Sequence, residues 1–199
     1  MRTFIEIGAA DFDTMLDAKG WRGIICEPHP VFYNKLKKQC TNPHIEILEV
    51  AVSTKLGTST MYFPTEEYLN FTEGDSRTEW TRGAGGFRIP GWTHKLDNAL
   101  EEYGHDQKYT MDLEVKTTTL DELVEQHCYN HIDFLKIDTE GHDADILEAY
   151  SWRIKPTFIK CEHGKHNRPD VITQRITDIL DTQGYKYWIE DWDVYAVWM

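Results

Sequence analysis

The sequence predicts an α/β protein built on a mostly parallel sheet, and three observations lead to this class. Short runs rich in β-branched and aromatic residues alternate with amphipathic helical patterns from almost the first residue, which is typical of a parallel sheet. The chain has 199 residues, about one domain's length, and 40% of them are hydrophobic, which suffices for a buried core. No apolar run approaches the ~18 residues that a membrane span needs, and the mean hydropathy is −0.57. We therefore expect one soluble globular domain over residues 1–199.

The elements expected in the first third of the chain begin and end at characteristic residues. Gly20 ends the first helix, and Pro30 stands in the first turn of the second, where a missing N–H costs little. A turn at 55–57 joins the two strands that follow. In chain order we expect a strand over 3–8, a helix over 11–19, a strand over 22–27, a helix over 30–40, a strand over 45–53 and a strand over 58–63.

Residues from about 64 to 110 lack a clear hydrophobic period and are rich in polar residues and glycine. Within them we expect a helix over 93–103, because Leu96, Leu100 and Tyr103 fall on one face. Long irregular segments in compact domains often carry function. We expect this insertion to act as a lid or as a substrate-binding segment.

The last third of the chain returns to the alternating pattern. Two of its strands end in carboxylates, Asp138 and Glu162. Pro169 opens the last helix and Gly184 closes it. In chain order we expect a strand over 112–117, a helix over 120–126, a strand over 132–138, a helix over 141–150, a strand over 157–162, a helix over 169–182, and a hairpin of strands over 185–190 and 194–198.

Charge and cysteine usage narrow the classes of function. The chain has 21 basic and 34 acidic side chains and a net charge of −13, which disfavours binding to nucleic-acid phosphates. Its four cysteines form no C-x-x-C pair, so a structural zinc site is disfavoured. The first apolar stretch is broken by Glu6 and makes a poor export signal. We expect a cytoplasmic protein with reduced thiols that binds no membrane.

Small and acidic residues follow the first two strands of the expected sheet. The first strand runs into Gly8-Ala9-Ala10-Asp11, and the second ends at Glu27. In open α/β sheets, ligands bind at the carboxyl ends of the strands, and an acid about 20 residues after a small-residue turn reaches ribose hydroxyls. The turn lacks the G-x-G-x-x-G pattern that a dinucleotide needs. S-adenosylmethionine has no pyrophosphate, and acidic neighbours suit its sulfonium, so it fits this turn better than a dinucleotide does. Packing alone also explains a small-residue turn.

Several strings of the sequence resemble those of the FkbM-type methyltransferases. They are F-I-E-I-G-A-A-D, I-I-C-E-P-H-P, V-A-V-S, T-T-L-D-E-L and, most specific, I-D-F-L-K-I-D-T-E-G-H-D-A-D-I-L. The resemblance covers residues 4 to about 184, apart from 64–110. It implies a Rossmann-like class I methyltransferase sheet of seven strands, mostly parallel with the last antiparallel, and helices on both faces. It also implies S-adenosylmethionine as the cofactor and methylation of a hydroxyl.

The resemblance assigns cofactor-binding roles to residues at the strand ends. In the first turn these residues are Glu6, Gly8, Ala9 and Ala10, and we add their neighbour Asp11. After the second strand comes Glu27, to which we add its neighbour Pro28. The others are Ala51, Val52 and Ser53 after the third strand, and Asp138 and Glu140 in the D-x-E-G motif. The first turn departs from the family pattern. Glu6 stands where Asp is usual, Ala10 where Asn is usual, and Phe12 near a usual Gly. A member that binds cofactor weakly or lacks activity would first differ here.

Methylation of an alcohol needs a base that removes its proton. Asp138, at the end of the strand expected next to the first, is the preferred base, and His142, Glu162 and His163 are alternatives. Glu140 would hold the amino group of the cofactor or a neighbouring loop. A second mechanism uses a divalent metal such as Mg²⁺ with Asp138, Glu162 and His163 as its ligands. The acids are explained equally well as helix caps.

Three classes of function fit these residues. The first is an active O-methyltransferase whose acceptor is the hydroxyl of a small molecule, a sugar, a glycan or a natural product. The second is a non-catalytic module of the same fold that binds adenosine or a partner. The third is a metal-dependent hydrolase that uses the carboxylates at 138, 140 and 162. The sequence indicates neither the acceptor nor the oligomeric state.

Overall fold

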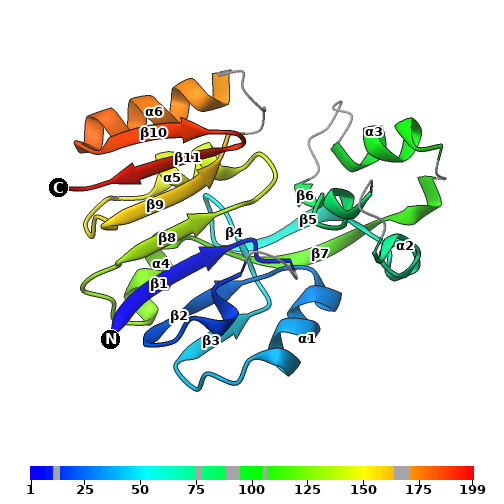
Figure 1. The fold of residues 1–199 in the computed structure, drawn as a ribbon, viewed down its shortest axis with the longest axis horizontal. Coiled ribbons are helices and arrows are strands. Elements are labelled where there is room, and N and C mark those ends of the chain that lie inside the picture. Colours follow the sequence, from blue (N-terminus) through cyan, green and yellow to red (C-terminus); the bar gives the residue numbers. More distant parts are fainter. Residues whose placement is uncertain (11–13, 75–77, 88–94, 105–106, 164–170) are drawn as a thin grey trace. The chain divides into compact units, whose positions relative to one another are not determined.

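The computed structural model of the protein describes residues 1–10, 14–74, 78–87, 95–104, 107–163 and 171–199 (Figure 1). The chain divides into two compact units. The larger unit comprises residues 1–57 and 116–199, and the smaller unit comprises residues 58–115. Among the described residues, no helix is long and apolar enough to cross a membrane.

The larger unit is built on a seven-stranded sheet with the strand order β10-β11-β9-β8-β1-β2-β3. In chain order these strands are β1 (Arg2–Ile7), β2 (Trp21–Cys26), β3 (Ile45–Leu48), β8 (Phe134–Ile137), β9 (Phe158–Glu162), β10 (Lys186–Glu190) and β11 (Asp193–Val197). β1 pairs in parallel with β2 and β8, whereas β11 runs antiparallel to both β9 and β10. The mostly parallel sheet with an antiparallel last strand, which the resemblance implied, is confirmed.

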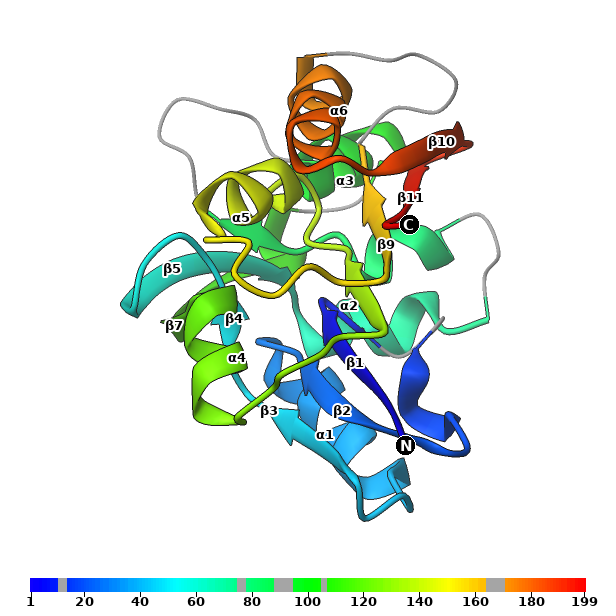
Figure 2. The same ribbon diagram turned by 90° about the vertical axis from the view of Figure 1, so that its left-hand side faces the viewer.

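Helices lie on both faces of this sheet because its strands are buried on both sides. Ile5 of β1 belongs to a core that includes Leu147 and Leu180, while its neighbour Phe4 belongs to another core with Leu36, as the alternation of side chains along a strand requires. Figure 2 shows α4 and α5 on one side of the strands. The helices of the larger unit are η1 (Met15–Asp17), α1 (Pro30–Gln39), α4 (Leu120–Gln126), α5 (Asp143–Ala149) and α6 (Val171–Gln183).

Two of these helices begin at the caps that their sequences provide. Thr119 accepts a hydrogen bond through Oγ1 from the backbone N–H of Glu122 at the start of α4, at 3.1 Å. His29 accepts one through Nδ1 from Val31 N at 3.2 Å, directly before Pro30 opens α1. Local sequence therefore fixes where each of these two helices begins.

The smaller unit has its own elements and its own core. The core consists of Tyr62, Tyr68, Ala84, Leu96 and Leu100. Its elements are β5 (Gly57–Pro64), α2 (Glu66–Thr72), η2 (Glu79–Arg82), β6 (Gly86–Phe87), α3 (Lys95–Glu102), η3 (Gln107–Tyr109) and most of β7 (Thr110–Thr118), whose last residues pair with β4 (Ala51–Val52) of the larger unit. The expected helix over 93–103 thus corresponds to α3, and the role of the insertion as a lid stays a prediction.

Three expectations about elements need correction. The single strand expected over 45–53 is two strands, because β3 pairs with β2 whereas β4 pairs with β7. The helix expected from 141 begins at Asp143, since Glu140 and Gly141 have φ of +57° and +110°, which no α-helix accommodates. Within the span 11–19, the described residues form only the short turn η1, and residues 11–13 lie outside the described part of the chain.

Candidate functional site

The turn after β1 is packed directly against the loop after β8. Gly8 has φ of +78°, and a Cβ added there would lie 1.8 Å from the carbonyl oxygen of Asp138. The N–H of Asp138 donates to the carbonyl of Ile7 at 2.8 Å, which holds the two strand ends together. Ala10 also has a positive φ, +44°. Position 8 therefore requires glycine both for its conformation and for its space.

The carboxylate of Glu27 is turned toward this turn and is buried. Its Oε2 accepts from Ala9 N at 3.2 Å and from Ala10 N at 2.8 Å, and its Oε1 accepts from His29 N at 2.7 Å. Burial raises the pKa of Glu27 to about 7, although these three N–H groups oppose the shift. Glu27 therefore lies at the small-residue turn and binds its backbone, and its role toward a ribose stays a prediction.

Glu6 connects β1 with β8 and with the start of η1. Its Oε1 accepts from Nζ of Lys136 at 3.2 Å, with both side chains almost fully buried. Its Oε2 accepts from Thr14 Oγ1 and from Met15 N, both at 2.8 Å. A glutamate in place of the usual aspartate is thus engaged with a strand on one side and with η1 on the other. Asp11, the remaining first-turn candidate, lies outside the described residues.

The D-x-E-G loop is anchored by a residue that the sequence reasoning missed, Asp143. Its Oδ2 accepts from Thr139 N at 3.1 Å and from Thr139 Oγ1 at 2.5 Å, and its Oδ1 accepts from Glu162 N at 3.0 Å. The carboxyl is fully buried, and burial raises its pKa to about 7. The only local signal was the position of Asp143 in the first turn of α5, where an acid is favoured by the helix dipole.

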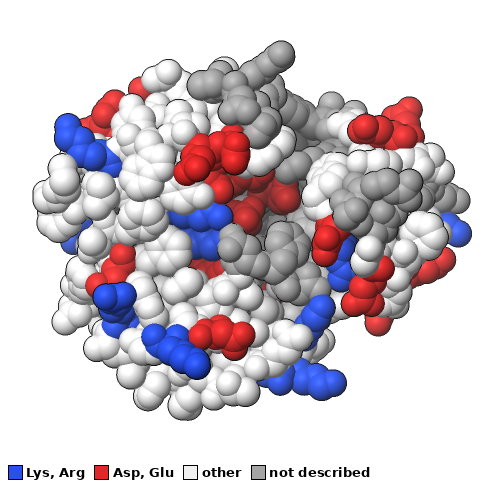
Figure 3. All heavy atoms as spheres, in the orientation of Figure 1, with Lys and Arg blue, Asp and Glu red and all other residues white. Residues whose placement is uncertain are grey.

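Three carboxylates meet at the carboxyl ends of β8 and β9. Oxygen atoms of Asp138, Glu140 and Glu162 lie within 4.8 Å of one another. Burial raises the pKa of Asp138 to about 6, and the charge of Glu162 adds to the shift while Lys136 opposes it. Figure 3 shows acidic side chains gathered near the middle of the view, beside a group of Lys and Arg side chains. Such a cluster has hard oxygen ligands, yet exposed acids commonly gather without a metal.

His163, expected as a base or a metal ligand, lies apart from this cluster. The residue is fully buried. Its Nδ1 is 3.0 Å from Thr173 Oγ1, and its Nε2 is 3.1 Å from the carbonyl oxygen of Asp191. Both ring nitrogens are therefore engaged, and the acid that joins Asp138 and Glu162 is Glu140 rather than this histidine.

His142, which follows the D-x-E-G loop directly, meets Ser53. Nε2 of His142 lies 3.3 Å from Ser53 Oγ, and Nδ1 lies 2.9 Å from Asp145 Oδ2. Burial lowers the pKa of His142 below its ordinary value, although Asp145 opposes the shift, so the ring is neutral at pH 7. Ala51 and Val52 are buried in β4, and Pro28 is half-buried. Among Ala51, Val52 and Ser53, it is thus Ser53 whose side chain contacts His142.

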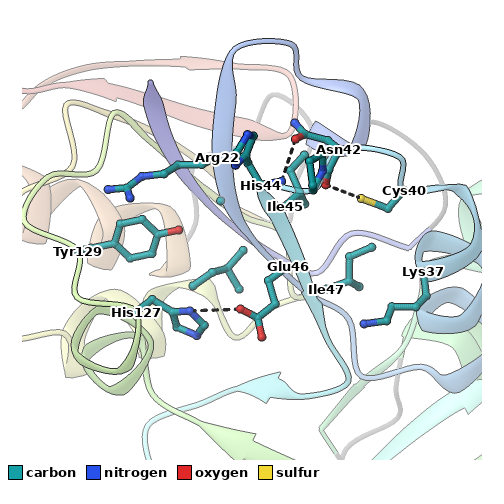
Figure 4. A pocket seen from close by; sticks show the side chains of 13 residues that line it. Arg22, Lys37, Cys40, Asn42, His44, Ile45, Glu46, Ile47, His127 and Tyr129 are labelled. Carbon is teal, nitrogen blue, oxygen red and sulfur yellow. Dashed lines mark hydrogen bonds and ion pairs between the residues drawn. The ribbon is translucent and has the colours of Figure 1, made fainter.

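A separate hollow of about 530 Å³ borders β3 at the edge of the sheet and contains none of the expected site residues. Figure 4 shows Arg22, Tyr129 and His127 on one side of the strand and Lys37 on the other. Glu46 extends toward His127, whose Nδ1 lies 3.5 Å from Oε2 of the glutamate. Charged side chains therefore line the free edge of the sheet.

The sheet and the strand-end loops together define a Rossmann-like class I methyltransferase fold. The family model described as "Methyltransferase FkbM domain" matches residues 6–187. The chain belongs to this family. A search of curated protein sequences found no match.

A solved structure titled "METTL16 MTase domain (crystal form 2)" is similar at 12% identity and a TM-score of 0.41. The alignment covers 99% of this chain and 59% of the other. The chain thus spans less than two thirds of the length of that relative.

Proposed function

We propose that this protein is an O-methyltransferase that methylates a hydroxyl of a small molecule or glycan. The observation that carries the proposal is the position of Asp138, next to the small-residue turn, with a pKa raised to about 6. A base works best when its pKa lies near the working pH. At pH 7 to 8 this carboxylate is ionised, and it is more basic than an ordinary aspartate.

The residues at the strand ends suit S-adenosylmethionine, which supplies an electrophilic methyl group when bound. The turn of Gly8, Ala9 and Ala10 carries no side chain larger than a methyl, so a ligand can approach its backbone. Glu27 would hold the ribose hydroxyls, and Glu140 would hold the amino group of the cofactor.

Proton removal is assigned to Asp138. It would take the proton of the acceptor hydroxyl as the oxygen attacks, while the loops align the two reactants in a site that excludes water. His142 is a second candidate for the base, since its ring is neutral at pH 7. Metal assistance would draw on Asp138, Glu140 and Glu162.

Isothermal titration with S-adenosylmethionine and S-adenosylhomocysteine tests the nucleoside site. We expect micromolar binding to the intact chain and its loss in Glu27→Ala. Glu49→Ala is the matched control, because Glu49 is an exposed acid that follows β3 as Glu27 follows β2, and it should bind as the unchanged protein does. No nucleoside binding to the intact chain would overturn the proposal.

Methyl transfer to a panel of sugars, glycans and phenols tests the acceptor class. A product that withstands mild base is a methyl ether and supports a hydroxyl acceptor, whereas release of methanol indicates a carboxylate. Asp138→Asn should lose about 10²-fold or more in turnover under saturating S-adenosylmethionine. Nucleoside binding without turnover on any acceptor would indicate a binding module. Mg²⁺ binding without nucleoside binding would favour the hydrolase alternative.

A further inference from the structure

Ser53, His142 and Asp145 are arranged in series across one imidazole ring. The serine oxygen lies 3.3 Å from Nε2, and the aspartate Oδ2 lies 2.9 Å from Nδ1. An ionised carboxylate only accepts hydrogen bonds, so Nδ1 carries the proton of the neutral ring. Nε2 is then an acceptor, and it faces the hydroxyl of Ser53. This is the order of groups that activates a serine for nucleophilic attack.

Other histidines in the described part of the chain meet hydroxyls without forming such a series. At His131, one ring nitrogen, Nε2, meets both neighbours: Asp133 at 3.1 Å and Thr157 at 3.5 Å. No proton can therefore pass through the ring from one neighbour to the other. In His163 the group opposite the hydroxyl of Thr173 is a backbone carbonyl, and the ring is fully buried. His142 combines a serine and a carboxylate on opposite nitrogens, and its side chain is 22% exposed.

The three residues are held by further contacts. Arg175 donates from Nη2 to the other oxygen of Asp145, at 2.7 Å, and to Oε2 of Glu148 at 2.6 Å. The backbone N–H of Ser53 donates to the carbonyl of Thr118 at 2.8 Å. Asp145 and the backbone of Ser53 are therefore each held by contacts that do not involve His142. Such contacts keep the reacting groups aligned for proton transfer.

We propose that Ser53 is a nucleophile activated by His142 and Asp145, and that it reacts with small carboxylic esters. In the first step Ser53 Oγ bonds to the ester carbonyl carbon while its proton moves to His142 Nε2. The carbon–oxygen bond to the alcohol then breaks, and the alcohol leaves with that proton. Water attacks the acyl-serine in the second step, with its proton taken by His142, which returns a proton to Ser53 as the carboxylic acid leaves. The net reaction is ester hydrolysis, and no cofactor takes part.

Labelling with a fluorophosphonate probe, which phosphonylates activated serines with loss of fluoride, tests the proposal without S-adenosylmethionine. We expect one adduct on the intact chain, mapped by peptide mass spectrometry to Ser53 and absent in Ser53→Ala. His142→Asn should slow labelling by about 10²-fold or more, the usual contribution of a positioned base. Asp145→Asn should slow it by at least about tenfold, because the ring loses its orienting acid. p-Nitrophenyl acetate hydrolysis should fall in the same order.

Ser151 provides a matched control within the same chain. Its hydroxyl donates to Asp121 Oδ1 at 2.5 Å, Ser151 is exposed, and no histidine takes part in that contact. Ser151→Ala should leave labelling and ester hydrolysis unchanged, and thermal unfolding should show that each variant is folded. Failure to label Ser53, or equal labelling of folded His142→Asn and intact protein, would overturn the proposal. Because no methyl donor is present, the result is independent of the proposed methyl transfer.

Discussion

Gly8 is the residue at which the candidate site tolerates the least change. We expect Gly8→Ala to destabilise the fold by at least about 2 kcal/mol, since a positive φ costs about 1 kcal/mol and the new Cβ overlaps the carbonyl of Asp138. Gly20→Ala is the control, because Gly20 has the same φ of +78° but nothing within 4 Å of an added Cβ. Urea unfolding measures both, and equal losses would contradict this account.

The raised pKa of Asp138 predicts a gain in stability when its charge is removed. The folded-state pKa of about 6 lies above the ordinary value of 3.8, so the folded state binds more protons between these pH values, and the free energy of unfolding falls as pH rises through them. Asp138→Asn should therefore be more stable than the intact protein at pH 7.5 by about 1 to 3 kcal/mol. The difference should vanish near pH 4.

Asp133 is the control, because replacing its carboxylate should change the free energy of unfolding in the opposite direction. Burial raises its pKa, but hydrogen bonds from Thr3 and His131 outweigh burial and lower the pKa below its ordinary value. The ionised carboxylate therefore stabilises the fold above pH 4, and Asp133→Asn should be less stable at pH 7.5. Chemical unfolding across pH 4 to 8 distinguishes the two variants, and a destabilised Asp138→Asn would show that this carboxylate is not strained.

The sequence predicts where single residues lie better than it predicts which residues they contact. The positions of Glu27 and Asp138 follow from strand ends, because consecutive parallel strands deliver their last residues to one edge. That Glu27 would accept from three backbone N–H groups, or that Glu6 would pair with Lys136, depends on side-chain packing between segments far apart in sequence. Neither periodicity nor motif spacing carries that information.

At the level of elements, Asp143 controls the loop between β8 and α5. We expect Asp143→Ala to destabilise the fold by about 1 to 3 kcal/mol, because it removes the acceptor of the partly buried N–H groups of Thr139 and Glu162. The loop that carries Asp138 should then loosen, and nucleoside affinity should fall about tenfold or more. Calorimetry and urea unfolding measure the two effects.

Asp121→Ala is the control for that variant. Asp121 accepts from Ser151 N and Ser151 Oγ at an exposed site, where water replaces the lost partner. Its removal should cost little stability and leave nucleoside affinity unchanged. A matching loss of affinity in both variants would show that the loop does not depend on Asp143.

Elements with strong local signals were predicted well, and elements set by pairing were not. The helix expected over 120–126 coincides with α4, whose cap Thr119 is adjacent in sequence. The break between β3 and β4 depends on which distant strand each segment joins, which a continuous apolar run does not reveal. The resemblance implied an antiparallel last strand, but the position of β11 between β9 and β10 was not predicted.

For the whole molecule, the division into two units predicts unequal local stability. The core of the smaller unit is a small cluster, whereas the larger unit is packed on both faces of its sheet. Segments with few buried contacts open at lower free energy. We expect backbone amides of β5 to exchange with deuterium at least about tenfold faster than those of β1. Equal protection in hydrogen-exchange mass spectrometry would show that the units unfold together.

The free edge of β3 has a consequence for behaviour at high concentration. An unpaired strand edge is a template on which another chain can add a strand, and proteins counter this with charge and proline. Here Pro43 precedes the strand, the side chain of Glu46 extends from the strand on one side, and Lys37 of α1 lies on the other. An incoming strand would have to bury these charges, so this rim works as a gatekeeper against cross-β aggregation.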